Sequence, residues 1–164
     1  MPESIFVDEN TTIPSDDVPD LQRIAQRKLG RCLLRLQQYE RQLRVIVAHG
    51  ELNGPADRLH TISEQKIVCA QKKTMGMLVG GLTESFLTLP PPNEEELQTK
   101  TDAGDQIWFS YRHQLEMPAE HYEATKVALK ELVDLRNELV HHFLERFDLW
   151  SESGCQAADG FLEE

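Results

Sequence analysis

The first long pattern in the chain is a series of apolar residues that recur at every third or fourth position. This spacing is typical of a helix with one buried face, here about eight turns long. Pro19 suits the first turn of the helix, and His49-Gly50 marks its end. The apolar positions are Leu21, Ala25, Leu29, Cys32, Leu36, Tyr39, Leu43 and Ile46.

Two shorter helical patterns follow a predicted turn at Asn53-Gly54-Pro55. The first covers residues 56–71 and the second covers residues 74–87, and Pro90-Pro91-Pro92 ends the second. Residues 93–105 are predicted to form an exposed acidic loop. Three glycines in the second pattern either lower its helical propensity or allow a neighbouring helix to approach closely: Gly76, Gly80 and Gly81.

Between residues 107 and 115 apolar and polar residues alternate, which is the period of a β-strand. The strand needs a partner, so it either pairs with residues 87–89 or forms a β-arm on a helical body. A long helix is predicted from Pro118 to about Phe147, and Ser151 begins a final one. The pattern therefore predicts a mostly α fold, a helical bundle of about five helices with a single strand or small β-arm near residues 107–115.

Length and composition agree with a small globular protein. The chain has 164 residues, 40% of them hydrophobic and 27% charged. We expect residues 1–18 to form a flexible acidic arm and residues 19–164 to form one helical domain. The domain is expected to be truncated at the C-terminus, because Glu163-Glu164 carries no helix stop signal.

The sequence shows neither an apolar run of membrane-spanning length nor the basic and apolar start of a signal peptide. The three cysteines are far apart and form no CxxC pair, so neither a disulfide framework nor a zinc site is predicted. We therefore expect a cytoplasmic protein without a membrane partner. No nucleotide or metal motif is recognisable, and no cofactor is predicted.

The charge of the chain is unevenly distributed. The net charge is −11, which argues against wholesale wrapping by nucleic acid. Residues 21–44 are nevertheless basic, with Arg27, Arg31 and Arg35 among their cations. One interpretation is a solvated helix face beside an acidic tail, and the other is a stripe that faces phosphates.

The segment Leu135–His142 carries the most distinctive chemistry. Arg136 falls near the middle of an apolar helix face, where an arginine needs a carboxylate, a partner subunit or a phosphate. Asn137 and His141 are four residues apart and nearly eclipsed on a helix, so the amide can orient the imidazole. Arg136 and His141 are five apart, about 140° around an α-helix.

These residue types suit RNA cleavage without a metal ion. A histidine can move a proton at a ribose 2′-hydroxyl or at the leaving 5′-oxygen. An arginine offers a planar fork of donors to the charge that develops on the scissile phosphate. A cation held by the adjacent His141 and His142 with neighbouring acids is disfavoured, because adjacent helical side chains point about 100° apart.

The motif Arg136-Asn137-x-x-x-His141, late in a helix, resembles the R-x(4–6)-H motif of the HEPN superfamily. This resemblance implies an all-helical, metal-independent ribonuclease or an RNA-binding relative, acting as a homodimer whose two motifs form one cleft. A wider similarity, covering most of residues 19–158, relates the chain to the helical region that precedes OST-HTH/LOTUS domains in bacterial proteins. Its matching segments are residues 20–31 and 135–143.

The leading hypothesis is a HEPN-like endoribonuclease or RNA-binding domain. Its catalytic residues would be Arg136, Asn137 and His141, and its RNA-binding residues would be Arg27, Arg31, Arg35 and His142. The alternative is a noncatalytic dimerisation or adaptor domain, and a third is the toxin of a two-component system.

Structural alternatives remain for the same residues. Arg136 could form a buried ion pair with Glu84 or Asp134 that holds two helices in register. His141 and His142 could be ordinary histidines favoured by a helix C-terminus. The aromatic residues Trp108, Phe109 and Tyr111 could stack on unpaired bases or simply belong to a half-buried strand.

Overall fold

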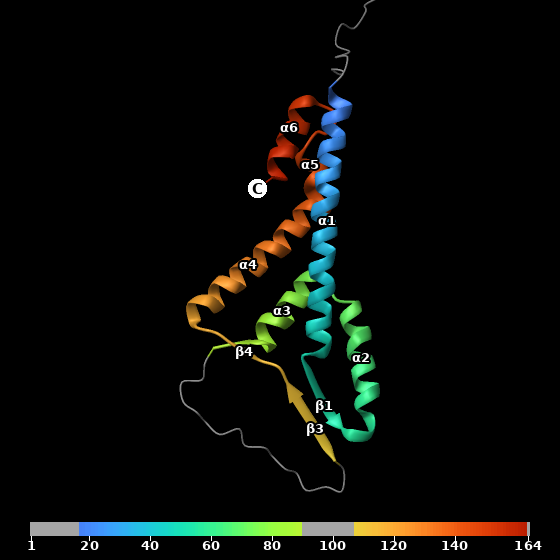
Figure 1. Ribbon diagram of the computed structural model, residues 1–164, viewed down its shortest axis with the longest axis vertical. Coiled ribbons are helices and arrows are strands. Elements are labelled where there is room, and N and C mark those ends of the chain that lie inside the picture. The colour runs from blue at the N-terminus through green and yellow to red at the C-terminus, as the bar shows by residue number, and fades with distance from the viewer. Residues whose placement is uncertain (1–16, 90–106, 164) are drawn as a thin grey trace, which may run out of the picture. The chain divides into compact units, whose positions relative to one another are not determined.

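The computed structural model describes residues 17–89 and 107–163, and it is mostly helical (Figure 1). Its helices are α1 (Val18–His49), α2 (Leu59–Gln71), α3 (Met75–Ser85), α4 (Ala119–Asn137), α5 (Phe143–Arg146) and α6 (Glu152–Phe161). A 3-10 turn, η1, covers Ala56–Arg58, and a π-helical turn, η2, covers Glu138–His142. The strands are β1 (Glu51–Pro55), β2 (Leu87–Thr88), β3 (Trp108–Arg112) and β4 (Leu115–Glu116). The predicted mostly α fold with a small β-arm is confirmed.

The internal contacts divide the chain into two compact units, which we describe separately. The first unit combines residues 1–33 with residues 139–164, and the second unit comprises residues 34–138. The predicted acidic arm lies mainly in residues 1–16, outside the described residues, and so does the predicted loop at 93–105. Within the described ranges, no helix is long and apolar enough to span a bilayer.

The first unit has a core of aromatic and small side chains. The rings of Phe143 and Phe147 lie 5.0 Å apart, and those of Phe147 and Phe161 lie 5.3 Å apart. Ala25 of α1 and Cys155 of α6 are fully buried. The predicted cap is confirmed, because Ser151 Oγ accepts a hydrogen bond from the backbone N–H of Gly154 at 3.1 Å.

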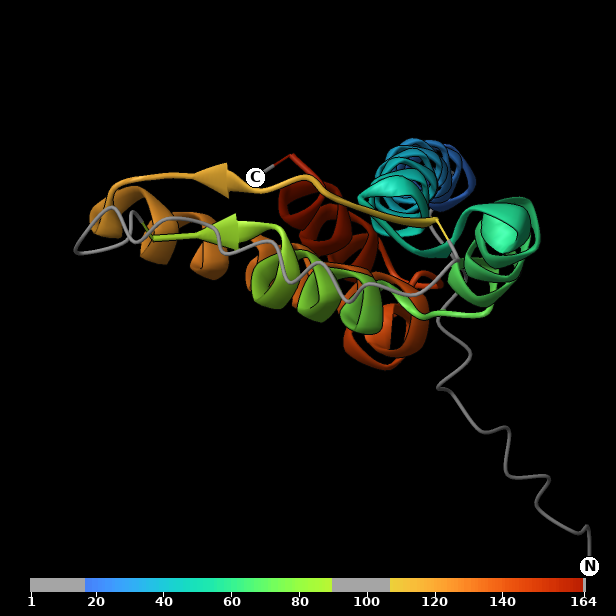
Figure 2. The ribbon, with the colours of Figure 1, turned by 90° about the horizontal axis from the view of Figure 1, so that it is seen from below.

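In the second unit, α3 approaches two other helices at its glycines. A Cβ atom on Gly76 would lie 3.7 Å from Val133 of α4, and one on Gly81 would lie 3.8 Å from Val47 of α1. Figure 2 shows α3 running beside α4. The buried side chains of α3 are Met75, Leu78 and Val79. A Cβ at Gly76 or Gly81 would therefore make ordinary van der Waals contact with the neighbouring helix, so helix packing does not require glycine there, and Gly80 has nothing near its Cβ position.

The β-arm, which we define as β1 and β3, also belongs to the second unit. The two strands pair antiparallel, with Glu51 opposite Arg112 and Pro55 opposite Trp108. The predicted turn at Asn53-Gly54-Pro55 is therefore wrong, because these residues form β1. Gly54 is buried on α2, where an added Cβ would lie 2.4 Å from Ile62 Cδ1. A side chain there would require the end of the Ile62 side chain to move, which favours a glycine at this position of the strand.

The alternating segment 107–115 divides its pairing between two partners. Its first part, β3, pairs with β1, and Leu115 begins β4, which pairs in parallel with β2 at Leu87. The two predicted alternatives were therefore each correct in part. The long helix predicted to reach Phe147 is also divided, since α4 ends at Asn137, η2 follows, and α5 ends at Arg146.

Candidate functional site

The Arg136-Asn137-x-x-x-His141 motif crosses from α4 into η2. Arg136 and Asn137 are the last residues of α4, and His141 and His142 are the last residues of η2. The boundary between the two units falls between Glu138 and Leu139. Arg136 and Asn137 thus belong to the second unit and His141 to the first, and each half is described in its own unit.

Arg136 is half-buried, and α4 has no fully buried residue. Its Nη1 donates to Oδ1 of the exposed Asn137 at 3.4 Å. Asp134, one of the two carboxylates considered as its partner, bonds Lys130 Nζ at 3.0 Å. The guanidinium is therefore not buried on an apolar helix face. Its position requires an anionic partner less strongly than the apolar pattern of the sequence predicted.

His141 and His142 are both exposed. Their ring centroids are 6.3 Å apart with the planes inclined by 68°, so the two imidazoles face different directions. His142 Nδ1 lies 3.0 Å from Glu145 Oε2, which engages this histidine with a carboxylate of its own unit. Among the described residues no group of three or more His, Cys, Asp or Glu side chains could hold a metal ion.

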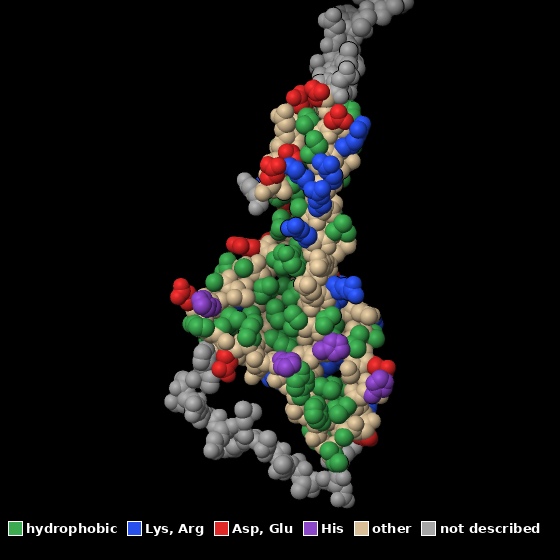
Figure 3. All heavy atoms as spheres, in the orientation of Figure 1, with side chains coloured by type: hydrophobic (Ala, Val, Ile, Leu, Met, Phe, Trp, Pro, Cys, Tyr) green, Lys and Arg blue, Asp and Glu red, His purple; other side chains and the backbone are tan. Residues whose placement is uncertain are grey.

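Arg27, Arg31 and Arg35 are exposed on α1 and follow each other at four-residue intervals. Figure 3 shows Lys and Arg side chains gathered along the N-terminal part of this helix. Lys28 differs from them, because its Nζ contacts Asp159 and Glu163 of the same unit at 2.5 Å each. The hydrogen bonds that Lys28 donates to Asp159, and next to Glu163, raise the pKa of Lys28. The basic stripe therefore consists of the three arginines without this lysine.

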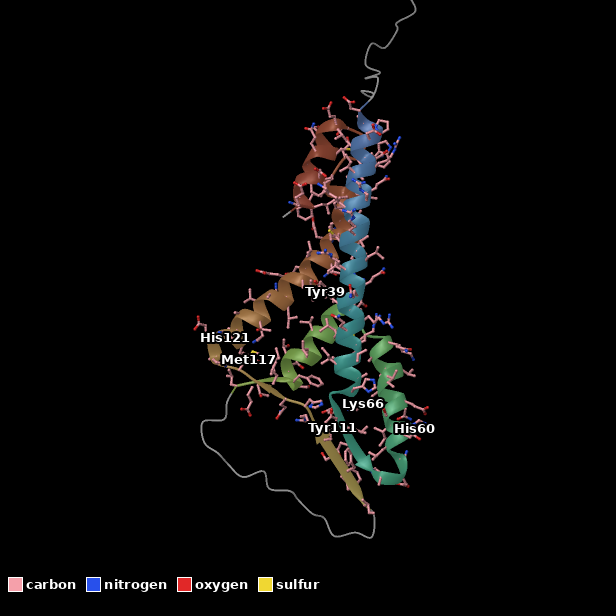
Figure 4. The ribbon with its side chains drawn as sticks, in the orientation of Figure 1. Tyr39, His60, Lys66, Tyr111, Met117 and His121 are labelled. Atoms are coloured by element: carbon pink, nitrogen blue, oxygen red, sulfur yellow. The ribbon has the colours of Figure 1, made fainter. Side chains whose placement is uncertain are left out.

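The β-arm holds a second cluster of polar and aromatic side chains. Glu51 contacts Lys66 at 3.0 Å and Arg112 at 3.2 Å, and the Lys66 hydrogen bond is the main cause that lowers the pKa of Glu51. Figure 4 labels Lys66 on α2, beside the start of β1. At the other end of the arm, Trp108 Nε1 donates to Asn53 Oδ1 at 2.6 Å.

The sequence pattern located β3 but not this cluster. Alternation over residues 107–115 placed Trp108 and Arg112 on one strand, but β1 contains Gly54 and Pro55 and has no alternating pattern. The carboxylate and the amide that β1 supplies to the cluster were therefore missed. A basic residue opposite an acidic one in a proposed strand pair would have been the only available signal.

Comparisons with protein-family models, with curated proteins and with solved structures found no match.

Proposed function

We propose that this chain is a HEPN-like RNA-acting domain, either a metal-independent endoribonuclease or an RNA-binding relative. In this proposal it acts as a homodimer, and Arg136, Asn137 and His141 contact the scissile phosphodiester. Arg136 stabilises the developing charge, His141 transfers the proton and Asn137 orients the imidazole. Arg27, Arg31, Arg35 and His142 bind the RNA strand.

The observation that carries the proposal is the π-helical turn at Glu138–His142, inside the motif. Such turns are rare, interrupt α-helices as single turns and occur frequently at functional sites. Arg136 lies on α4 just before this turn and His141 lies within it, so the turn interrupts the helix between the two motif residues. The interruption marks this segment as a candidate functional site.

The surface of α4 supports the homodimer. Val127 is 56% exposed and Leu135 is 42% exposed, although both are large and apolar. Leu129, Leu132 and Val133 of the same helix are only half-buried. A helix with apolar side chains and no fully buried residue gains stability when another surface covers it. We assign that surface to a second copy of the chain.

The test is cleavage of single-stranded RNA by the purified chain in EDTA. We expect fragments with 2′,3′-cyclic phosphate ends, because the 2′-hydroxyl is the nucleophile when no metal-activated water is used. His141→Ala should lower the rate by roughly 10²- to 10⁴-fold, the usual contribution of a general acid or base. The matched control is His121→Ala, an exposed histidine at the start of α4 (Figure 4) that should leave the rate unchanged.

Arg136→Ala separates the ribonuclease from the adaptor domain, which the exposed residues of α4 also favour. In a ribonuclease or RNA-binding protein this variant loses activity or RNA affinity while its melting temperature and dimerisation stay close to those of the wild type. In an adaptor, Arg136→Ala lowers the melting temperature or dissociates the dimer, and the wild type neither cleaves nor binds RNA. That second result would refute the proposal.

A further inference from the structure

The β-arm exposes a tryptophan whose orientation is already fixed. Trp108 is 63% exposed, yet its indole N–H donates to Asn53 Oδ1 at 2.6 Å. A half-buried strand was the structural alternative for this residue, and the exposure of Trp108 argues against that alternative. A hydrogen bond at the ring edge holds the indole in one orientation, which lowers the entropic cost of stacking a ligand on its face.

The residues beside Trp108 form one continuous face of the β-arm. Side chains alternate along a strand, so every second residue of β3 lies on this face together with its partners from β1. The face consists of Trp108, Ser110 and Arg112 opposite Pro55, Asn53 and Glu51. The other face carries Gly54, which lies against Ile62 of α2. The face of Trp108 therefore points away from the α2 contact at Gly54.

The charge on this face favours an anionic ligand. One carboxylate, Glu51, is shared by two cations, Lys66 and Arg112, and leaves one positive charge in excess. Cations also outnumber anions over β1, η1, α2 and the turn after α2, although the whole chain has a net charge of −11. Together with Arg112 of β3, the cations are Arg58, Lys66, Lys72 and Lys73. The anions are Glu51, Asp57 and Glu64.

The face also offers polar groups between the ring and the guanidinium. Ser110 and Asn53 are both exposed, and they face each other across the strand pair. Asn53 uses its carbonyl oxygen for Trp108, which leaves its amide N–H groups pointing to no acceptor among the described residues. An aromatic ring, amide donors and a guanidinium along one strand match a base, its edge and a backbone phosphate.

We propose that this face binds single-stranded RNA, with an unpaired base stacked on Trp108 and a neighbouring phosphate at Arg112. The inference rests on the proposed function for its ligand, but it assigns a site separate from the Arg136 motif. Figure 3 shows hydrophobic side chains gathered over the β-arm. The stacking contact should tolerate any base, because every base has a π face.

The chain contains two tryptophans and therefore offers a matched control. Trp150 is 71% exposed, as accessible as Trp108, and it belongs to the first unit. Trp108→Ala should weaken binding of a single-stranded oligouridine roughly five- to 150-fold, the usual effect of removing one base stack. Trp150→Ala should bind like the wild type, and Trp108→Phe should restore most of the affinity because it keeps a ring.

A direct readout uses the fluorescence of Trp108 in the Trp150→Phe variant. Oligouridine should quench this emission, and a fully paired RNA duplex should not, because its bases are already stacked. Arg112→Gln should weaken binding and reduce its salt dependence by about one phosphate contact. Circular dichroism of each variant checks that the fold is intact.

Several results would overturn the inference. Unchanged oligouridine affinity in Trp108→Ala, with no quenching, refutes it even if Arg136→Ala and His141→Ala abolish cleavage. Loss of self-association in Trp108→Ala, with RNA affinity unchanged, would assign the face to a second copy of the chain instead. The converse result is quenching of Trp108 by RNA while Arg136→Ala and His141→Ala leave cleavage and RNA affinity unchanged. That result would support this site and refute the proposed function.

Discussion

The two units differ in how completely they bury their apolar residues. The first unit contains nearly as many buried apolar side chains as the second, from about half as many described residues. Its core is closed by aromatic packing around Phe147 and by Cys155, whose Sγ donates to Leu149 O at 3.2 Å. In the second unit the buried apolar side chains are instead distributed over α1, α3 and short strands.

The second unit leaves more large side chains in solvent. On α4, on the β-arm and immediately before β3 these are Ile107, Trp108, Phe109, Val127 and Leu135. Folding alone gives no reason to expose a tryptophan and a phenylalanine beside each other on one strand. The first unit thus keeps most of its large apolar side chains buried or half-buried, while the β-arm and α4 of the second unit leave such side chains exposed.

The largest expected effect tests the core of the first unit. Phe143 is 2% exposed, so Phe143→Ala should lower the free energy of unfolding by about 3–5 kcal/mol. Leu144→Ala is the adjacent control, because Leu144 is 66% exposed and its loss should cost less than about 0.5 kcal/mol. Urea denaturation measures both values.

Amide hydrogen exchange then shows whether the units open independently. In Phe143→Ala, faster exchange confined to α5 and α6 would confirm that the first unit has its own core. Equal acceleration in α2 and α3 would contradict the comparison, since both units would then unfold as one.

A glycine substitution of the same kind should have opposite effects in the two units. In the first unit, a Cβ on Gly154 would lie 1.9 Å from the backbone oxygen of Asp148, so Gly154→Ala should destabilise it by roughly 1–3 kcal/mol. In the second unit, Gly80 lies within α3 with open space at its Cβ position, so Gly80→Ala should stabilise it by roughly 0.5–1 kcal/mol. Thermal melting of both variants measures the sign, and a shift in the same direction would contradict the local geometry.

The smallest effect is the response of the two units to pH. Glu51 has a lowered pKa in the second unit, so its stabilising contribution is present above the unfolded value of 4.5 and is lost as the pH falls through the lowered value. Lys28 has a raised pKa in the first unit, so its contribution is present below 10.5 and is lost as the pH rises through the raised value.

The ion pairs of Glu51 and Lys28 should therefore lose their stabilising effect at opposite ends of the pH scale. The difference in unfolding free energy between wild type and Glu51→Gln should be less than about 1 kcal/mol at neutral pH, because solvent reaches both partly exposed side chains, and should vanish once Glu51 is protonated. The difference between wild type and Lys28→Met should vanish in strong alkali. A Glu51→Gln difference that does not shrink as the pH falls from neutral into the acid range would show that the lost contact is not electrostatic.

The helices were predictable because their signals are local. Apolar spacing located α1 between Pro19 and His49, and a serine cap located the start of α6. The strand β1 could not be predicted, because its only reason to be extended is its pairing with β3, more than 50 residues later in the chain. Its Gly54 and Pro55 are more typical of a turn when no partner is visible.

The candidate sites were predictable only as residue types. The spacing of Arg136 and His141 is visible in the sequence, but the π turn between them is not, because both helix types fit the same apolar pattern. The degree of burial also escaped prediction, since Arg136 was expected on a covered face and α4 is not fully covered. The amide partner of Trp108 required the register of the β-arm.

The three cysteines differ in accessibility in a way that suits chemical labelling. Cys69 is exposed on α2, Cys32 is half-buried on α1, and Cys155 is buried in the first unit. A thiol-specific dye at limiting concentration should therefore attach first to Cys69, on the helix that packs against the β-arm. Cys155 should react only after its unit opens, because burial also raises the pKa of its thiol. In the unaltered chain, Cys69 therefore offers an attachment point for a fluorophore in the second unit. The labelling rate of Cys155 reports how often the first unit unfolds.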